Sequence, residues 1–402
     1  MAGGIIVQKY GGSSVADLER LGRVADKILE TKREGHRVVV VVSAMGKTTD
    51  GLLAQARQVD PEPPRRELDM LVSTGERVSM ALLSIAIQKR GAEAISFTGS
   101  QAGIITTDRH FDARIVAVRP HRVIEELEKG KVVIVAGYQG VSEAKEVTTL
   151  GRGGSDTTAV ALAAALDAER CEIYSDVDGV YTADPRVVPD AAHIPVLDYE
   201  TLQTMAENGA KVLNAQAVEW AKRAGIEIHA RHTGQRYEGG QPAEDSRQSV
   251  VRALEPNERR AAAVSGEKGL VLLSLQGTSA LGVLGDACAA AEVSPRELVV
   301  DPRGGVTALF SLLNAPDWAR SERVLRERLP EATLRSALAG ATAVGDGLTG
   351  VAGPLAPARL AALVGDAPVH GAIVGPLRAT LLVDEERVDG LVRAMHAAVV
   401  AR

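Results

Sequence analysis

The chain has 402 residues, of which 45% are hydrophobic and 24% are charged, and its formal net charge is −6. This length predicts roughly two or three domains with a large core. The acidic balance and the scattered basic residues argue against a general nucleic-acid partner. The sequence predicts neither a membrane span nor secretion, because it has no long apolar run and no charged-then-hydrophobic start. Cys171 and Cys288 are far apart in sequence, and we expect reduced thiols in a cytoplasmic protein.

The first segment with distinctive chemistry follows a short apolar run at 5–7. Lys9 ends this run, two glycines and two serines follow at 11–14, and an amphipathic pattern covers 17–32. This order predicts a buried strand, a glycine turn and a helix opened by a serine cap. Glycines and a helix start favour a bound phosphate, and Lys9 adds a full positive charge. The turn is neither a Walker loop nor a dinucleotide fingerprint, and the protein-kinase motifs do not occur.

Up to about residue 235, apolar runs alternate with helical patterns. The β-branched run Val38–Val42 is typical of a parallel strand covered on both faces. Further strands are expected at 95–97, 132–135 and 172–174, and helices at 67–90, 116–129 and 156–166. The alternation predicts an α/β fold with a doubly wound sheet, whose ligands bind at the carboxyl ends of the strands.

The last third of the chain differs in composition. Residues 233–249 have no periodicity and many turn-forming residues, which predicts a linker. Beyond it, strand, turn and helix patterns recur twice, and each unit ends in another strand and an amphipathic helix. We therefore expect two small α+β modules of roughly 70 residues each.

Several glycine- and hydroxyl-rich segments follow predicted strands. They lie at 43–46, 73–76, 151–156 and 175–186. The segment at 151–156 could be a flexible turn before a helix capped by Ser155 or Asp156. Arg152 favours a binding role instead, because an arginine between glycines has no packing purpose. The three aspartates at 175–186 lack the EF-hand glycine and final glutamate, so we do not expect a calcium site.

Five segments together resemble aspartate kinases of the amino-acid kinase family, in order and in spacing. They are Lys9–Ser14, Phe97–Gly103, Thr149–Thr158, Ser175–Arg186 and Gly209–Leu213. The resemblance runs from residue 5 to about 213. It implies a three-layer α/β/α catalytic domain with a mostly parallel sheet at 1–235, a linker at 236–260, and ferredoxin-like ACT modules at 261–335 and 336–402.

The implied reaction transfers the γ-phosphoryl group of ATP to the side-chain carboxylate of L-aspartate, the first step toward lysine, threonine and methionine. Such a transfer needs positioning and charge neutralisation, and an ionised carboxylate needs no general base. Lys9 would neutralise the transferring group and Asp156 would hold Lys9 in place. Arg152 suits the substrate α-carboxylate, and Glu76 suits its α-ammonium.

The resemblance also implies further contacts. Hydrogen bonds around the substrate charges are expected from Ser43, Thr49 and Ser155. ATP contacts are implied for Lys9, Gly11, Gly12, Ser13, Ser175, Asp176, Tyr181, Arg186 and Lys211. Mg²⁺ is expected on the nucleotide phosphates, and we name no protein ligand for it. The ACT modules imply a homodimer or a higher homo-oligomer.

The chain departs from the family pattern at the expected effector sites. The segments Leu275–Gly282, Val293–Leu298 and Val374–Arg378 do not match, and Asn214-Ala215 stands where His-Pro or a similar pair is common. Our hypothesis is that the tail folds and pairs chains, but senses lysine or threonine weakly or not at all.

Two other functions stay open at this point. One is a kinase of the same fold for another acidic amino acid in a specialised pathway. The other is a catalytically silent sensor of nucleotide and amino acid, which the presence of Lys9, Arg152 and Asp156 argues against. Acetylglutamate and uridylate fit less well, because neither has the free ammonium that Glu76 would bind.

Overall fold

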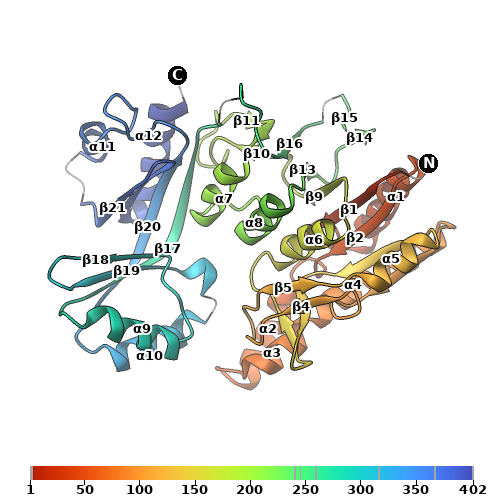
Figure 1. Cartoon of the computed structure of the whole chain (residues 1–402), viewed down its shortest axis with the longest axis horizontal. Coiled ribbons are helices and arrows are strands. Elements are labelled where there is room, and N and C mark those ends of the chain that lie inside the picture. Colours follow the sequence, from red (N-terminus) through yellow and green to blue (C-terminus); the bar gives the residue numbers. More distant parts are fainter. Residues whose placement is uncertain are drawn as a thin grey trace. The chain divides into compact units, whose positions relative to one another are not determined.

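The computed structural model describes residues 3–239, 241–244, 246–258, 260–315, 317–365 and 368–400. The chain forms two compact units (Figure 1). The first comprises Met1–Tyr181, His193–Ala206 and Lys211–Ala261. The second comprises Thr182–Ala192, Glu207–Ala210 and Ala262–Arg402.

The first unit is built on an eight-stranded sheet of order β12-β16-β13-β9-β1-β2-β6-β3. Its strands are β1 (Ile5–Tyr10), β2 (Arg37–Val42), β3 (Ala94–Phe97), β6 (Val132–Ala136), β9 (Arg170–Ser175), β12 (Val196–Leu197), β13 (Ile228–His232) and β16 (Gln248–Val251). All neighbours pair in parallel except β13 and β16. The predicted mostly parallel sheet is therefore confirmed, and the β-branched run of β2 lies buried at its centre.

Helices cover both faces of this sheet and complete the predicted three layers (Figure 1). On one face, α1 (Leu18–Arg33) and α4 (Thr74–Lys89) share a hydrophobic cluster with β2 and β6. Helix α6 (Gly154–Ala165) packs on β1, β2 and β9 and contacts α8 (Ala215–Ala224). The remaining helices are α2 (Thr48–Val59), α3 (Arg65–Val72), α5 (His121–Glu128) and α7 (Tyr199–Glu207).

A second, four-stranded sheet has the order β5-β4-β7-β8. Its strands are β4 (Ile104–Thr106), β5 (Ile115–Val118), β7 (Gln139–Ser142) and β8 (Val147–Thr149). The predicted helix at 116–129 is therefore wrong in its first part, which forms β5. The β-branched start favours a strand, and Pro120 restricts the chain before α5 begins at His121. The predicted helix at 67–90 is divided at Ser73 into α3 and α4.

The structure also differs from the predicted linker at 236–260. This range contains β14 (Tyr237–Glu238), β15 (Gln241–Pro242) and β16, and β16 lies inside the main sheet between β12 and β13. The other short hairpin pairs β10 (Val180–Tyr181) with β11 (His193–Ile194). β16 has only four residues, of which three are apolar or hydroxyl-bearing, so no hydrophobic period reveals this strand.

The stretch Arg65–Lys89 is the one described helical segment that is long and apolar enough to cross a membrane by length and composition. Half of its most apolar window is buried inside the fold. On α4, Met80, Leu83 and Ile87 belong to the hydrophobic cluster on the α1 face of the sheet. A core helix passes the same test of length and composition, so this feature carries little weight.

The second unit repeats one pattern of strand, helix, strand, strand and helix. The first copy is β17 (Ala263–Leu275), α9 (Ala280–Ala290), β18 (Glu297–Val300), β19 (Val306–Ser311) and α10 (Trp318–Arg328). The second copy is β20 (Thr333–Val344), α11 (Pro357–Val364), β21 (Gly371–Val374), β22 (Arg378–Asp384) and α12 (Val388–Val400). Short 3₁₀ turns, η1 (Leu312–Asn314) and η2 (Glu385–Arg387), follow β19 and β22.

All six strands of this unit form one antiparallel sheet of order β18-β19-β17-β20-β22-β21. The two copies are therefore joined through their first strands, β17 and β20. The predicted boundary at 335 falls inside β20, and the division into modules stays a proposal. Helices α9 and α10 cover one hydrophobic cluster, and α11 and α12 cover another. Antiparallel strand–helix modules are nevertheless present, as the sequence predicts.

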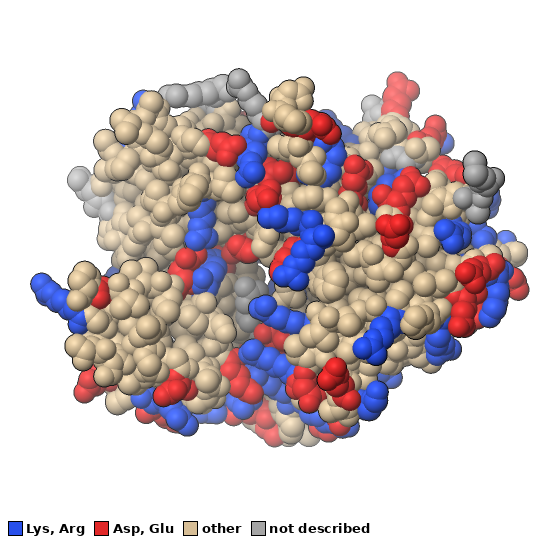
Figure 2. Space-filling model, in the orientation of Figure 1, with Lys and Arg blue, Asp and Glu red and all other residues tan. Residues whose placement is uncertain are grey.

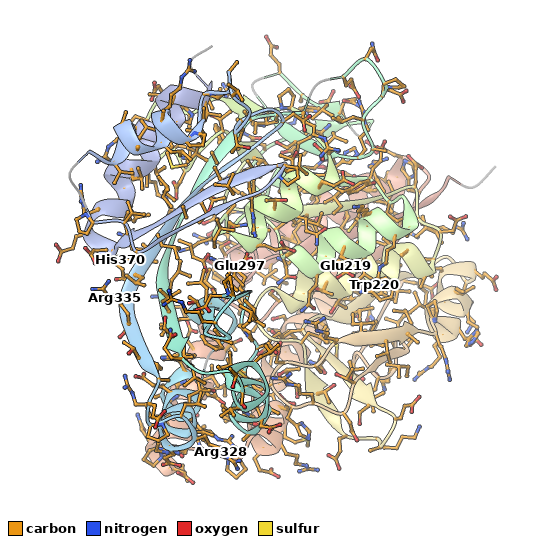
Figure 3. The ribbon with its side chains drawn as sticks, turned by 60° about the vertical axis from the view of Figure 1, so that its left-hand side comes forward. Glu219, Trp220, Glu297, Arg328, Arg335 and His370 are labelled. Atoms are coloured by element: carbon orange, nitrogen blue, oxygen red, sulfur yellow. The ribbon has the colours of Figure 1, made fainter. Side chains whose placement is uncertain are left out.

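Charges on the visible face of the molecule are mixed in sign, with acidic and basic side chains interspersed (Figure 2). A group of hydrogen-bonded polar side chains lies on the second unit, where Arg335 and His370 are neighbours (Figure 3). Because the Arg335 guanidinium can only donate, His370 Nδ1 accepts, and His370 Nε2 donates to Asp384 Oδ1 at 2.8 Å. Both cysteines are free and buried.

Candidate active site

Lys9 and Asp156 form an ion pair beside the carboxyl end of β1. Lys9 belongs to β1 and Asp156 to the first turn of α6, and Lys9 Nζ lies 2.6 Å from Asp156 Oδ1. Each side chain is only 11% exposed. Charges so far from water are costly unless they are paired, and a slight exposure still lets a ligand reach them. The structure thus brings together the two residues predicted to be catalytic.

The glycine turn after β1 is packed tightly against the segment after β2. A Cβ at Gly12 would lie 2.9 Å from the Ala44 carbonyl oxygen, so this position requires glycine. Gly11 N–H donates to the Tyr174 carbonyl at 3.1 Å and continues the ladder between β1 and β9. That N–H group is therefore already used within the protein. Ser13 is exposed beyond it.

The predicted serine cap of the first helix is wrong. Helix α1 begins at Leu18, and Asp17 is its N-cap, with Oδ1 accepting from the Arg20 N–H at 2.8 Å. The glycine turn after β1 is longer than predicted, and the Ser14 side chain bonds to another residue. Its hydroxyl lies 2.6 Å from Thr233 Oγ1.

A buried carboxylate faces the segment after β2. Glu76 lies in the first turn of α4, is 3% exposed, and accepts the Ala44 N–H at Oε1 over 3.1 Å. Its Oε2 is buried and has no hydrogen-bond partner among the described residues. Burial raises the pKa of Glu76 to about 7, against the hydrogen bonds that lower it. A buried carboxylate oxygen that accepts no hydrogen bond indicates a site where a donor group of a ligand can bind.

Two predicted hydroxyl residues lie on the same segments. Ser43 directly follows β2 and donates its N–H to the Tyr10 carbonyl at 3.1 Å. Thr49 lies in the first turn of α2 and is half-buried. Ser43 therefore directly precedes Ala44, whose N–H contacts Glu76, whereas contacts of Ser43 and Thr49 with Glu76 stay predictions.

The loop before α6 carries Arg152 between two glycines in the left-handed region. Gly151 has φ 70° and Gly153 has φ 72°, and the Arg152 side chain is exposed. Gly153 is the N-cap of α6 and makes no side-chain cap, so neither Ser155 nor Asp156 caps this helix. Asp156 is held by Lys9 instead. Ser155 is buried against Gly137, where a Cβ would lie 2.7 Å from its Oγ.

Asp69 on α3 supports the neighbouring loop, and sequence reasoning missed it. This fully buried carboxylate accepts from Thr149 Oγ1 at 2.5 Å and from the Phe111 N–H at 3.1 Å, and it lies 2.8 Å from His110 Nδ1. Burial raises its pKa despite these bonds. The only signal in the sequence is an acidic residue between apolar neighbours on a helix. His110 is a loop residue, as predicted.

The nucleotide residues implied by the resemblance belong to several segments of the chain. Ser175 ends β9 and Asp176 is exposed after it. The Tyr181 hydroxyl donates to Asp178 Oδ1 at 2.8 Å. Arg186 belongs to the second unit, where it pairs with Asp184 at 2.7 Å, and Lys211 is exposed in the first. Nucleotide contacts by these residues stay predictions.

Thr233 links the glycine turn after β1 to the end of β9. Sequence reasoning missed this residue because it lies in the predicted linker. Its N–H and its hydroxyl both donate to the Ser175 carbonyl, at 2.9 and 3.0 Å. Its Oγ1 then accepts from the Ser14 hydroxyl. The Thr233 side chain therefore contacts both the glycine turn after β1 and Ser175, one of the residues expected to contact the nucleotide.

Curated relatives match somewhat more than half of the chain. The aspartokinase of Mycolicibacterium smegmatis is 61% identical over 228 residues, which cover 56% of this chain and 54% of that protein. The aspartokinase of Corynebacterium glutamicum is 58% identical over 228 residues, with the same coverage. The matched region thus spans about half the length of these curated relatives.

Solved structures extend the likeness of the fold to the whole chain. The structure of E. coli aspartokinase III in complex with aspartate and ADP has a TM-score of 0.83 at 24% identity, and covers 98% of this chain and 100% of that chain. Aspartate kinase from Synechocystis has a TM-score of 0.55 at 33% identity, and covers 98% of this chain and 69% of that chain.

The match to a family model covers the strand ends, the glycine turn and the buried ion pair described above. The model of the amino acid kinase family matches residues 4–232, more than half of the chain. The chain therefore belongs to the amino acid kinase family.

Proposed function

We propose that the protein is an ATP-dependent aspartate kinase, which transfers the γ-phosphoryl group of ATP to the side-chain carboxylate of L-aspartate and forms 4-phospho-L-aspartate. The observation that carries this proposal is the set of charges at one end of the sheet. The Lys9–Asp156 pair, the buried Glu76 and the exposed Arg152 provide both signs of charge for an amino acid and a polyphosphate. The names of the similar proteins support the same reaction.

Repulsion between a carboxylate and a polyanion is the main barrier that the site must lower. Lys9 Nζ offsets the charge of the transferring phosphoryl group, and Asp156 fixes Lys9 at 2.6 Å without a further conformational change. The N–H groups of Gly12 and Ser13 contact phosphate oxygens in this proposal. Gly11 shapes the turn rather than donating to the ligand, because Tyr174 occupies its N–H.

Recognition of an α-amino acid follows from Glu76 and Arg152. The α-ammonium takes the open position at Glu76 Oε2, and its charge restores the ionised form of a carboxyl whose pKa burial raises to about 7. Arg152 meets the α-carboxylate with two parallel hydrogen bonds. Ser43, Thr49 and Ser155 add hydrogen bonds around these groups.

The nucleotide contacts Ser175, Asp176, Tyr181, Arg186 and Lys211 in this proposal. Mg²⁺ enters on the phosphate oxygens, where it neutralises charge when bound. No group of three or more His, Cys, Asp or Glu side chains that could hold a metal ion occurs among the described residues. The phosphates therefore supply most of the ligands.

Three wider proposals accompany this function. The protein acts in the cytoplasm, at the first step toward lysine, threonine and methionine. Two or more chains associate through the ACT-type modules of the second unit. These modules respond to lysine or threonine weakly or not at all, because the predicted effector segments are replaced by other residues.

The test is ATP turnover with L-aspartate, with the acyl phosphate trapped by hydroxylamine. L-Glutamate, N-acetylglutamate and UMP are run in parallel as acceptors. Hydroxamate that forms with aspartate alone supports the proposal. Product with another acceptor alone would reassign the substrate, and no product with any acceptor would favour the silent sensor.

A further inference from the structure

Asn214 is the N-cap of α8, the helix that carries Glu219 and Trp220 in Figure 3, and it also contacts the substrate loop. Its Oδ1 accepts from the Gln216 N–H at 2.8 Å, as a capping side chain does. Its Nδ2 donates to the Arg152 carbonyl at 2.7 Å, across 62 residues of sequence. One side chain therefore joins the start of a helix to the residue proposed to bind the substrate α-carboxylate.

The orientation of this amide is fixed by its partners. A backbone N–H can only donate and a carbonyl can only accept, so Oδ1 faces Gln216 and Nδ2 faces Arg152. Thr157 Oγ1 donates to the same Oδ1 at 3.3 Å. Serine or aspartate could keep the cap at this position, but aspartate has no donor, and the serine hydroxyl is one bond shorter than Nδ2, so it cannot cap α8 and also reach the Arg152 carbonyl.

Besides the contact with Asn214, an internal turn restrains this loop, in which the Gly154 N–H donates to the Gly151 carbonyl at 3.1 Å. Gly151 and Gly153 flank Arg152, and both have positive φ angles, a conformation that glycine enters and leaves easily. A Cβ at Gly153 would lie 2.7 Å from Asn214 Cβ, so the two residues are in close contact. On the other side, a Cβ at Gly151 would lie 3.3 Å from Asp112 Oδ1. The loop is thus held between Asn214 and the loop that Asp69 supports.

We propose that Asn214 is a positioning residue, which fixes the Arg152 backbone so that its guanidinium is presented to the α-carboxylate of the substrate. The proposal rests on the aspartate-kinase function proposed above. Holding the loop in advance removes an entropic cost from substrate binding. Asn214 therefore strengthens aspartate binding without touching aspartate, and it has little influence on the nucleotide.

The decisive variant is Asn214→Ser, which keeps a capping hydroxyl and loses the amide donor that reaches the Arg152 carbonyl. Its KM for aspartate is expected to rise about 3- to 10-fold, as for the loss of one hydrogen bond, with kcat and the KM for ATP within about twofold. Asn214→Asp should raise the KM for aspartate at least as much, because a carboxylate would face the Arg152 carbonyl.

Gly225→Ala is the matched control, because it weakens α8 at its other end. Gly225 has φ 68° and nothing lies within 4 Å of a Cβ there, so the substitution strains the backbone alone. Its KM for aspartate should not change. If Gly225→Ala raises that KM as much as Asn214→Ser does, α8 stability is responsible and the proposal is overturned.

Two further measurements separate this proposal from the proposed function. In an Arg152→Ala background, Asn214→Ser should no longer lower kcat/KM for aspartate, and an undiminished effect would overturn the proposal. Hydrogen exchange of the amides at 151–153 should be faster in Asn214→Ser than in the wild type, whatever the substrate is. An unchanged exchange rate would overturn the proposal, whereas absent turnover by the wild type would refute only the function.

Discussion

Two buried carboxylates of the first unit, Glu172 on β9 and Glu76 on α4, differ in how their charge is paired. On the α1 face, Glu172 is 1% exposed and accepts from Gln8, Arg170 and Tyr174, and it pairs with Arg231 at 2.6 Å. The Lys9–Asp156 pair lies on the α6 face, whereas Glu76 on α4, a helix of the α1 face, has one oxygen without a hydrogen-bond partner among the described residues.

The pKa values follow this difference. Burial alone would raise the pKa of Glu172, but Arg231 and Arg170 outweigh it and lower the pKa to about 2. Burial raises the pKa of Glu76 to about 7, because only backbone N–H groups oppose it. Partners therefore decide the outcome at similar depth. A satisfied charge holds the fold, and a charge left unsatisfied is available to a ligand.

Removing Arg231 should have the largest effect on stability. Arg231→Met leaves Glu172 buried with one cation fewer, and the free energy of unfolding is expected to fall by about 3–5 kcal/mol. Chemical denaturation of the wild type and the variant measures this loss. The control is Arg223→Met, whose ion pair with Glu219 is exposed and should contribute less than about 1 kcal/mol. Equal losses in the two variants would contradict the comparison.

Removing Lys9 should instead affect the reaction. Lys9→Ala is expected to lower kcat about 10²- to 10³-fold, because the transferring phosphoryl group loses its positive partner. Circular dichroism should show that the fold is retained. A variant that keeps most of its activity would refute the proposed mechanism.

Glu76→Gln should stabilise the protein without ligand and weaken substrate binding. The folded pKa of Glu76 is about 7 against an ordinary value of 4.5, so the folded state keeps a proton that the unfolded chain releases. Stability is therefore lost as pH rises from about 4.5 to 7. Glutamine avoids this loss, and the variant should gain on the order of 1–3 kcal/mol at pH 8 but little at pH 4.5.

Denaturation of the wild type and Glu76→Gln at both pH values checks this sign. In the wild type, the KM for aspartate should also fall as pH rises toward 7, because the ionised carboxylate binds the ammonium. If the stability gain of Glu76→Gln does not depend on pH, Glu76 does not titrate in this range and the prediction is wrong.

The smallest expected effect concerns lysine and threonine. Either amino acid, titrated into the hydroxamate assay, should leave the rate within experimental error at sub-millimolar concentration. Clear inhibition in that range would show that the replaced segments of the second unit still form an effector site.

The sequence predicted the parts of the fold that depend on hydrophobic period. The β-branched runs gave the central strands β2 and β6, and the repeat beyond residue 262 was recognised from its strand and helix patterns. Short or polar elements were missed, including β16 and the four-stranded sheet. No period distinguishes a four-residue strand from a loop.

The sequence motifs predicted which residues form the candidate site, but not most of the contacts between them. Lys9 and Asp156 do meet, as the resemblance implied. The contacts of Asn214, Asp69 and Thr233 could not be predicted, because each joins loops that are far apart in the chain. Loop conformation also overturned the predicted serine cap of the first helix, since the Ser14 hydroxyl bonds to Thr233 instead.

The pairing of β17 with β20 makes the two repeats of the second unit inseparable. In each repeat, the first strand is flanked on one side by its own repeat and on the other by its partner repeat. A truncation before Thr333 would leave the 13 residues of β17 as a bare edge, which invites aggregation. Gene fragments that encode a single repeat should therefore be insoluble, and the pair is the smallest part of this unit that evolution could gain or lose.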